Sequence, residues 1–262
     1  MTPRLVATDL DGTLLRSDGR LSDRTRAVLA DLDARGVPVV IVTGRPMRWL
    51  EDLVPVVGHH GLAVVSNGAA VYDVASGEAT EVRGIEAVAG LELASRIQDE
   101  LPGATFAVES VAGITLAPGF VDLERIPEGN RVEALDELWT VPALKLLVRH
   151  PEADHERLRR AVDEAVGDLA TPTWSMEGLV EISAAGVTKA SALAALAARL
   201  GVTAAGTVAF GDMPNDVPML RWAGTSYAVA NAHADALAAA DRVAPANDDD
   251  GVAVVLGELF DL

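Results

Sequence analysis

Two aspartates separated by a single residue follow the first apolar run of the chain, in the segment Asp9-Leu10-Asp11-Gly12-Thr13. In an extended chain, residues i and i+2 point to the same side, so the Asp9 and Asp11 carboxylates project together. Two carboxylates this close repel each other unless a cation or a shared proton lies between them. An Asp-Gly turn that caps a helix is the commoner origin of this spacing. The position of the Asp9–Asp11 pair directly after a predicted buried strand instead predicts a metal site or an acid–base pair.

Two further segments carry polar groups next to predicted helix starts. Thr43, Gly44 and Arg45 follow the apolar run 39–42, and a hydroxyl with free backbone N–H groups can bind an anion there. The same residues could equally well only cap the helix. Lys189 opens an Ala- and Leu-rich helical stretch. A lone lysine is usually a solvated surface charge, but this one begins a helix of the predicted core.

Another aspartate, Asp212, lies just past the apolar run 207–210, and Asn215 and Asp216 stand where the next helical pattern starts. Turn and cap chemistry explains Asn215 and Asp216 better than it explains Asp212. With the aspartate pair above, Asp212 completes a set of three carboxylates on neighbouring strand ends. An oxygen-only set suits Mg²⁺, a hard cation that keeps several waters and binds beside phosphate. The sequence therefore predicts a Mg²⁺ cofactor.

The elements that must hold these groups alternate between apolar runs and helical patterns at both ends of the chain. Strands are predicted over 5–8, 37–42, 62–65, 207–210 and 227–229, and helices over 22–35, 46–57, 189–200, 216–223 and 251–259. Unbroken apolar strands separated by helices are typical of a parallel sheet covered on both faces. With right-handed crossovers, this is a doubly wound α/β domain.

The middle of the chain follows a different pattern. Helices are predicted over 85–101, 132–138 and 155–166, and strands over 105–108, 114–117, 144–148, 171–174 and 179–183. Two helix-plus-strand units in tandem indicate a small inserted α+β domain. We therefore expect a discontinuous core of residues 1–82 and 186–262, interrupted by a domain over 83–185.

Composition excludes several other functions. The 262 residues carry 21 Lys and Arg against 39 Asp and Glu, and the net charge of −18 would repel nucleic acid and anionic membranes. No cysteine is present, which rules out disulfides, thiolate metal sites and a thiol nucleophile. The first apolar run is too short for a signal peptide and none is long enough to span a bilayer, so we expect a soluble, cytoplasmic protein. A monomer and a homodimer fit the sequence equally well.

Taken in order, the four polar segments resemble the motifs of the haloacid dehalogenase superfamily of phosphotransferases, in particular its Cof-type phosphatases. The combination of Asp9-Leu10-Asp11-Gly12-Thr13 with the segment 211–216, Gly-Asp-Met-Pro-Asn-Asp, is highly specific. Smaller similarities are Ser66-Asn67-Gly68-Ala69, Glu181-Ile182 and Asn231-Ala232. The inserted domain lies between the second and third motifs, where Cof-type proteins carry an α/β cap over a Rossmann-like core. The resemblance thus implies the same architecture here.

The resemblance also implies a reaction. Asp9 would attack phosphorus to form an aspartyl-phosphate, and Asp11 would protonate the leaving alcohol and then deprotonate the hydrolytic water. Mg²⁺ would be bound by the Asp9 carboxylate, the Asp11 backbone carbonyl and the Asp212 carboxylate. The substrate would be a small phosphorylated metabolite, such as a sugar phosphate.

Further contacts around the phosphate follow from the same resemblance. It assigns Thr43, Gly44 and the catalytic Lys189 to the phosphoryl oxygens, Asn215 to the same region, Arg45 and Asn67 to the rest of the substrate, and Asp216 to support of Lys189 or of a metal-bound water. The composition of the inserted domain names no particular substrate.

Two alternatives remain open. A phosphomutase of phosphomannomutase type shares the Asp-x-Asp core, but it must keep the intermediate from water and usually needs a bisphosphate activator. A non-catalytic sensor of phosphorylated metabolites is the other alternative. It predicts loss of the nucleophile or of the acid–base residue, whereas Asp9 and Asp11 are both present.

Overall fold

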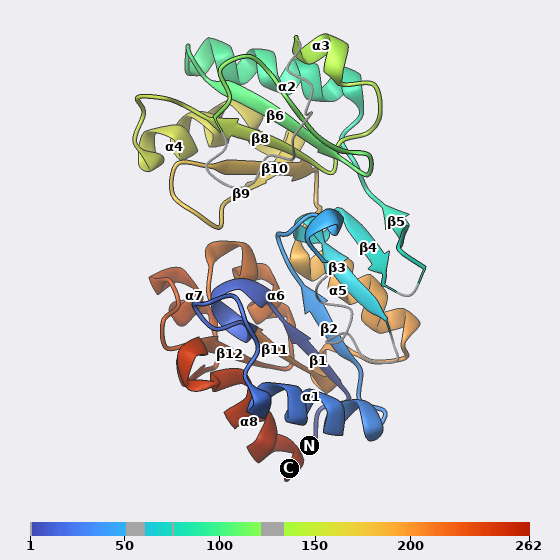
Figure 1. Ribbon diagram of the computed structural model, residues 1–262. Coiled ribbons are helices and arrows are strands. Elements are labelled where there is room, and N and C mark those ends of the chain that lie inside the picture. Colours follow the sequence, from blue (N-terminus) through green and yellow to red (C-terminus); the bar gives the residue numbers. More distant parts are fainter. Residues whose placement is uncertain (1, 51–60, 75, 122–133) are drawn as a thin grey trace. The chain divides into compact units, whose positions relative to one another are not determined.

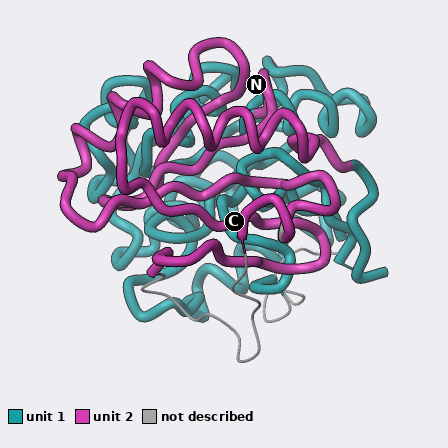
Figure 2. The backbone as a smooth tube through the Cα atoms, turned by 90° about the horizontal axis from the view of Figure 1, so that it is seen from above, with its two compact units in different colours: residues 1–81, 188–262 teal, residues 82–187 magenta. Residues whose placement is uncertain are grey.

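The computed structural model of the chain describes residues 2–50, 61–74, 76–121 and 134–262 (Figure 1). The chain forms two compact units, a first unit of residues 1–81 and 188–262 and a second unit of residues 82–187 (Figure 2). Within the described ranges, no helix is long and apolar enough to cross a membrane.

The first unit is built on an eight-stranded sheet with the order β13-β12-β11-β1-β2-β3-β4-β5. The strands are β1 Leu5–Thr8, β2 Val39–Val42, β3 Leu62–Val65, β4 Ala70–Asp73, β5 Glu78–Val82, β11 Thr207–Gly211, β12 Thr225–Val229 and β13 Arg242–Ala244. From β13 to β3 along the sheet, neighbouring strands are parallel. β4 pairs antiparallel with β3, an addition that the sequence patterns did not predict.

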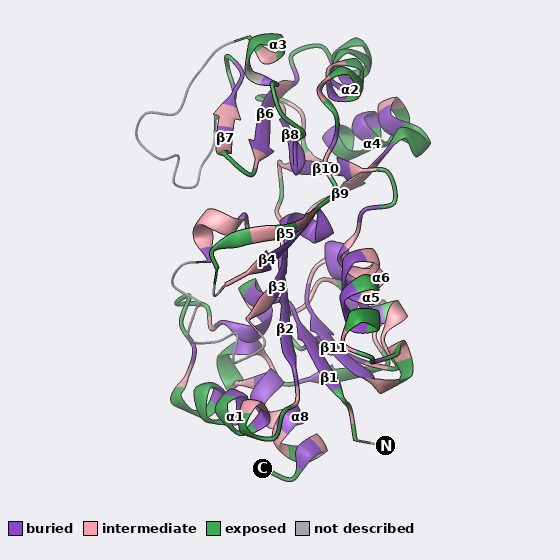
Figure 3. Cartoon of the chain, turned by 90° about the vertical axis from the view of Figure 1, so that its right-hand side faces the viewer, coloured by how far each residue is buried: buried purple, intermediate pink, exposed green. Residues whose placement is uncertain are grey.

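Helices cover both faces of this sheet, which confirms the predicted doubly wound α/β fold. They are α1 Asp23–Ala34, α5 Lys189–Arg199, α6 Val217–Trp222, α7 Ala234–Ala239 and α8 Gly251–Phe260. α5, α6 and α7 pack apolar side chains against one face, and α1 and α8 lie side by side on the other. Figure 3 shows β1, β2 and β11 as buried, whereas α1 mixes buried and exposed residues.

Local capping explains where the site-bearing helix begins. The backbone N–H of Ser191 donates to Thr188 Oγ1, and the backbone N–H of Thr188 donates to Ser191 Oγ, both at 3.0 Å. This reciprocal pair satisfies donors that a helix start otherwise leaves free. It therefore fixes Lys189 as the first residue of α5.

One predicted helix differs from the structure. The prediction over 46–57 is wrong for its first residues, because only a short 3₁₀ turn forms at Met47–Trp49. Pro46 has φ −72° and ψ 159°, an extended conformation, so it precedes this turn as its N-terminal cap and is not itself helical. Residues 51–57 of that prediction lie outside the described part of the chain.

The second unit is a five-stranded antiparallel sheet with the order β7-β6-β8-β10-β9. Its elements are α2 Ala87–Glu100, β6 Thr105–Ser110, β7 Gly113–Leu116, α3 Leu135–Leu138, β8 Lys145–Arg149, α4 His155–Val166, β9 Ala170–Thr173 and β10 Val180–Ala184. α2 and α4 share one apolar core with the sheet, as expected for the predicted α+β insert. Residues 132 and 133 of the predicted helix at 132–138 fall outside the described ranges.

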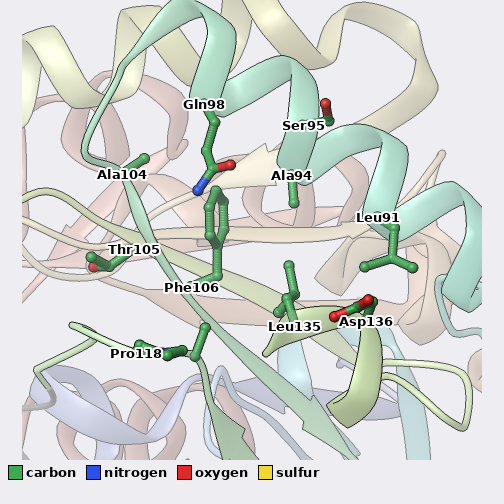
Figure 4. A pocket seen from close by; sticks show the side chains of 11 residues that line it. Leu91, Ala94, Ser95, Gln98, Ala104, Thr105, Phe106, Pro118, Leu135 and Asp136 are labelled. Atoms are coloured by element: carbon green, nitrogen blue, oxygen red, sulfur yellow. The ribbon is translucent and has the colours of Figure 1, made fainter. Parts of the chain in front are cut away.

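A pocket of about 450 Å³ lies in the second unit between α2, β6 and α3 (Figure 4). Its lining residues are Leu91, Ala94, Ser95, Gln98, Ala104, Thr105, Phe106, Ala117, Pro118, Leu135 and Asp136. The single charged group among them, Asp136, is negative and would repel a phosphate. This pocket is therefore not suited to the phosphoryl group.

Candidate active site

Asp9 and Asp212 follow two neighbouring parallel strands, β1 and β11. The chain continues from β1 to β2 and β3 on one side, and from β11 to β12 and β13 on the other, so the strand order reverses between β1 and β11. The Asp9 N–H donates to Phe210 O at 3.0 Å, which holds the two strand ends together. In doubly wound folds, ligands bind outside the carboxyl ends of strands at such a reversal.

The turn after Asp9 places Gly12 and Thr13 next to the Asp212 side chain. Gly12 has φ +73°, a left-handed conformation that glycine adopts without strain, and it redirects the chain within the wide helical turn at 10–14. Thr13 Oγ1 then donates to Asp212 Oδ1 at 2.9 Å. Thr13 therefore orients the Asp212 carboxylate, a role that the motif alone did not predict.

Lys189 lies between two buried carboxylates. Its Nζ is 2.6 Å from Asp9 Oδ1 and 2.6 Å from Asp216 Oδ1, and the lysine is only 1% exposed. The second oxygen of Asp216 accepts the backbone N–H groups of Asp212 and Met213, each at 3.0 Å. Asp216 thus fixes both the ammonium group and the backbone at Asp212.

Negative charge exceeds positive charge in this cluster. Burial, followed by Asp216 and Asp212, raises the pKa of Asp9 well above its ordinary value, and Lys189 offsets this only in part. Burial and Asp216 likewise raise the pKa of Asp212 to about 6. Burial lowers the pKa of Lys189, but Asp216 and Asp9 more than reverse that effect. The site therefore favours an additional cation.

The donor atoms suit a hard cation. Oxygens of Asp9, Asp212 and Asp216 lie within 4.8 Å of one another. Both oxygens of Asp216 are already engaged, whereas Lys189 bonds only Oδ1 of Asp9. The Asp11 carboxylate lies outside this group, so any contribution of Asp11 to a metal would come from its backbone. An all-oxygen set with excess negative charge fits the predicted Mg²⁺.

Space beside Asp212 gives a first prediction. A Cβ on Gly12 would lie 2.4 Å from Asp212 Oδ2, so Gly12→Ala is expected to displace that carboxylate. We expect Mg²⁺ affinity, measured by calorimetry without substrate, to fall by about 10-fold or more. Gly19→Ala is the matched control, because Gly19 has a similar φ of +77° but nothing within 4 Å of its added Cβ. Equal Mg²⁺ affinity in both variants would contradict the prediction.

A second cluster forms around the Thr43 loop. Thr43 N–H donates to Val64 O, Thr43 Oγ1 accepts the N–H of Arg45, and Thr43 O accepts the N–H of Asn67. Asn215 Nδ2 donates to Asn67 Oδ1 at 3.1 Å. The structure thus brings together residues that the sequence assigned to phosphate or substrate, and their roles stay predictions.

Gly44 belongs to the same cluster. A Cβ on Gly44 would lie 3.0 Å from Asn67 Oδ1, so the loop backbone approaches that side chain closely. Asn215 is 6% exposed, and its Oδ1 has no hydrogen-bond donor among the described residues. A buried acceptor of this kind is normally satisfied by a ligand or a water.

Arg45 and Asp11 form a bidentate ion pair. Arg45 Nε donates to Asp11 Oδ2 at 2.7 Å, and Nη2 donates to Oδ1. Their side chains are 26% and 55% exposed, so this pair is far more accessible than the Lys189 cluster. Arg45, predicted to contact the substrate, therefore also contacts Asp11, the predicted acid–base residue. The spacing of the motifs in the sequence could not predict this ion pair.

The chain is similar to phosphatases along almost its whole length. The sequence model for haloacid dehalogenase-like hydrolases matches residues 6–256. The HMP-PP phosphatase of Enterobacter sp. (strain 638) is 30% identical over 240 residues, which cover 87% of this chain and 85% of that protein. The phosphoglycolate phosphatase of Halorubrum lacusprofundi is 32% identical over 259 residues, covering 99% and 98%. Among solved structures, SMU.1108c from Streptococcus mutans UA159 has a TM-score of 0.86 at 25% identity and covers 100% of both chains.

Proposed function

Because the chain belongs to the haloacid dehalogenase-like hydrolases as a Cof-type member, and is a phosphoric monoester hydrolase like its relatives, we propose a Mg²⁺-dependent reaction through an aspartyl-phosphate on Asp9. One observation carries this proposal. The Asp9 residue is 5% exposed, its carboxylate accepts a hydrogen bond from Lys189 at one oxygen, and it lies beside Asp212 at the strand reversal.

In the first step, the free carboxylate oxygen of Asp9 attacks phosphorus, and the bond from phosphorus to the ester oxygen breaks. Asp11 donates a proton to the departing alkoxide, so an alcohol leaves. A carboxylate needs no base to activate it, provided that it is ionised. Lys189 stabilises that ionised form of Asp9 and also binds a phosphoryl oxygen.

In the second step, Asp11 takes a proton from water, and the resulting hydroxide attacks phosphorus. Inorganic phosphate leaves and the Asp9 carboxylate is restored. The guanidinium of Arg45 donates to both oxygens of Asp11 and so orients this carboxyl group for the proton transfer. Thr43, Gly44 and Asn215 are assigned to the phosphoryl oxygens, and Asn67 to the rest of the substrate.

The Asp9 and Asp212 carboxylates and the Asp11 backbone carbonyl would hold Mg²⁺. When bound, the ion would neutralise charge on the phosphoryl oxygens. Asp216 acts behind this set, because its two oxygens are bonded to Lys189 and to the backbone of residues 212 and 213. Thr13 steadies Asp212 from the other side.

The proposed substrates are phosphate monoesters of small metabolites, sugar phosphates or similar compounds. The names of two relatives, HMP-PP phosphatase and phosphoglycolate phosphatase, support small substrates but differ in the group that carries the phosphate. Phosphorylated metabolites are retained inside cells by their charge, so the proposal places the enzyme in the cytoplasm.

Metal removal tests this function. Hydrolysis of p-nitrophenyl phosphate is expected to stop in EDTA and to return with Mg²⁺. Asp212→Asn is expected to raise the Mg²⁺ concentration for half-maximal rate by about 10-fold or more. Asp99→Asn, which changes an exposed carboxylate on α2, is the control.

Activity that persists in EDTA, or an unchanged Mg²⁺ requirement in Asp212→Asn, would overturn the metal assignment. The same assay addresses the mutase alternative. A phosphatase hydrolyses its substrate with no bisphosphate present, whereas dependence on a bisphosphate activator would favour a mutase.

A further inference from the structure

A C-terminal segment, residues 247–250, forms hydrogen bonds with residues 15–17, which follow the aspartate pair Asp9 and Asp11. Asn247 Nδ2 donates to Leu15 O at 2.9 Å, and the Asn247 side chain is buried, with 6% of the residue exposed. The backbone N–H of Asn247 donates to Asn231 Oδ1 at 3.0 Å. Asn231 Nδ2 in turn donates to Gly12 O at 2.8 Å. Two asparagines thus connect the carbonyls at positions 12 and 15.

The two aspartates of this segment add a second set of contacts. Arg16 Nε and Nη2 donate to the two oxygens of Asp250, both at 2.9 Å. The backbone N–H and Oγ of Ser17 donate to the two oxygens of Asp248 at 2.8 and 2.7 Å. Residues 12, 15, 16 and 17 each therefore form a hydrogen bond with a residue more than 200 positions away.

The segment itself packs closely against the backbone of Pro245. Asp250 adopts φ +57°, and the next residue is a glycine whose added Cβ would lie 1.9 Å from Pro245 O. A larger residue than Gly251 cannot occupy that position without a backbone shift. The hydrogen bonds to residues 15–17 thus come from a closely packed turn at the start of α8.

The residues that these hydrogen bonds reach include Gly12, the glycine of the Asp9–Thr13 segment. Gly12 has no side chain to restrict its φ and ψ, yet it joins Asp11 to Thr13, which orients Asp212. Asn231 restrains the carbonyl of Gly12 from outside. Its own loop also holds Asp212, because the N–H of His233 donates to Asp212 O at 2.8 Å. The loops that carry the carboxylates are therefore fixed relative to each other through Asn231.

We infer that Asn247 and Asn231 are positioning residues for the phosphatase reaction, an inference that rests on the proposed function. They act through Gly12 and Leu15 and do not touch substrate. By fixing the Gly12 peptide, they set the direction of the Asp11 carbonyl and of the Thr13 hydroxyl, and hence of Asp212. Outer partners of this kind typically change metal affinity or activity by about 10- to 100-fold.

The test compares Asn247→Ala and Asn231→Ala with Asp249→Asn. Asp249 lies in the same turn and is exposed, and among the described residues its side chain forms no hydrogen bond with residues 12–17. For both asparagine variants we expect kcat for p-nitrophenyl phosphate to fall by about 10-fold or more, while KM stays within about 2-fold. Mg²⁺ affinity, measured by calorimetry on the substrate-free protein, is expected to fall by a similar factor.

A role in folding alone predicts a different result. Asn247 also anchors the start of α8, so its loss could lower Tm without any change in kcat or Mg²⁺ affinity well below Tm. That outcome would overturn the inference. If Asn247→Ala does not fold, the exposed Asn231 provides the deciding variant. If the wild-type chain hydrolyses nothing, the proposed function fails, and calorimetry still decides whether the asparagines position the Mg²⁺ site.

Discussion

The Asp9→Asn enzyme is expected to lose kcat by about 10⁴-fold or more without losing stability. An amide cannot form the phosphoryl-enzyme bond, and removal of a catalytic nucleophile costs up to about 10⁶-fold in well-studied hydrolases. The measurement is single-turnover hydrolysis of p-nitrophenyl phosphate with Mg²⁺, on protein whose folding is checked by circular dichroism.

The stability half of this prediction follows from the raised pKa of Asp9. Burial, Asp216 and Asp212 raise that pKa above the unfolded-state value, so the ionised carboxylate opposes folding at every pH above that value. At lower pH the carboxyl group is protonated in both states and the effect vanishes. In metal-free protein at neutral pH, Asp9→Asn removes the penalty. We expect a free energy of unfolding equal to or above that of the wild type.

Chemical trapping separates a nucleophile from a mere metal ligand. Borohydride reduction of acid-quenched wild-type enzyme is expected to convert an acyl phosphate at position 9 to homoserine, which mass spectrometry detects. Asp11→Asn is the matched control, since it keeps the nucleophile. The loss of kcat in Asp11→Asn is expected to be smaller with p-nitrophenyl phosphate, whose p-nitrophenolate leaves readily, than with an alkyl phosphate, whose leaving alkoxide needs a proton. Failure to trap position 9, with Asp9→Asn still active, would contradict the covalent mechanism.

Much of the fold could be predicted because its strands are unbroken apolar runs. β1 and β2 are buried along their whole length, and the sequence shows no alternation there. The hairpin from β3 to β4 could not be predicted in this way. It depends on a positive φ at Ser66 and Asn67, a backbone conformation that residues other than glycine rarely adopt. It also depends on Gly68, because a Cβ added there would lie 2.2 Å from Thr188 O. That close approach involves a segment distant in sequence.

The candidate site likewise has parts that the sequence pattern predicts and parts that only tertiary contacts determine. Asp9 and Asp212 could be placed together because each follows a predicted strand of one parallel sheet. The pairing of Arg45 with Asp11, and the hold of Asn247 on Leu15, depend on side-chain directions within loops. Loop conformations are set by tertiary contacts, and neither apolar periodicity nor motif spacing reports them. The same holds for Lys189, whose distances to Asp9 and Asp216 only the folded chain defines.

The second large effect is expected from Lys189→Met. Methionine has a similar length but no charge, so Asp9 and Asp216 would be left buried without their shared cation. Breaking a buried ion pair from one side costs about 3–5 kcal/mol. Although burial lowers the pKa of Lys189, Asp216 and Asp9 raise it overall, so its charge stabilises the fold at every pH below the ordinary lysine value. At neutral pH we therefore expect the full decrease in the free energy of unfolding.

Urea unfolding in EDTA measures this loss, and the same titration with Mg²⁺ should show a smaller one, because a bound cation supplies part of the missing charge. We also expect kcat/KM to fall by about 10²- to 10³-fold, the usual effect of removing one group that stabilises transition-state charge. Arg199→Ala is the control, since Arg199 lies on the same helix in an exposed ion pair with Glu81, where about 1 kcal/mol or less is expected.

The two measurements distinguish three roles for the lysine. A loss of stability in EDTA with unchanged kcat/KM would make Lys189 a structural counter-ion only, and would contradict its assignment to the phosphoryl oxygens. A loss of kcat/KM with stability close to that of Arg199→Ala would show that protonation of Asp9 replaces the missing charge. Loss of both, with stability partly recovered by Mg²⁺, is the result expected if one buried ammonium group both balances the carboxylates and binds the substrate's phosphate.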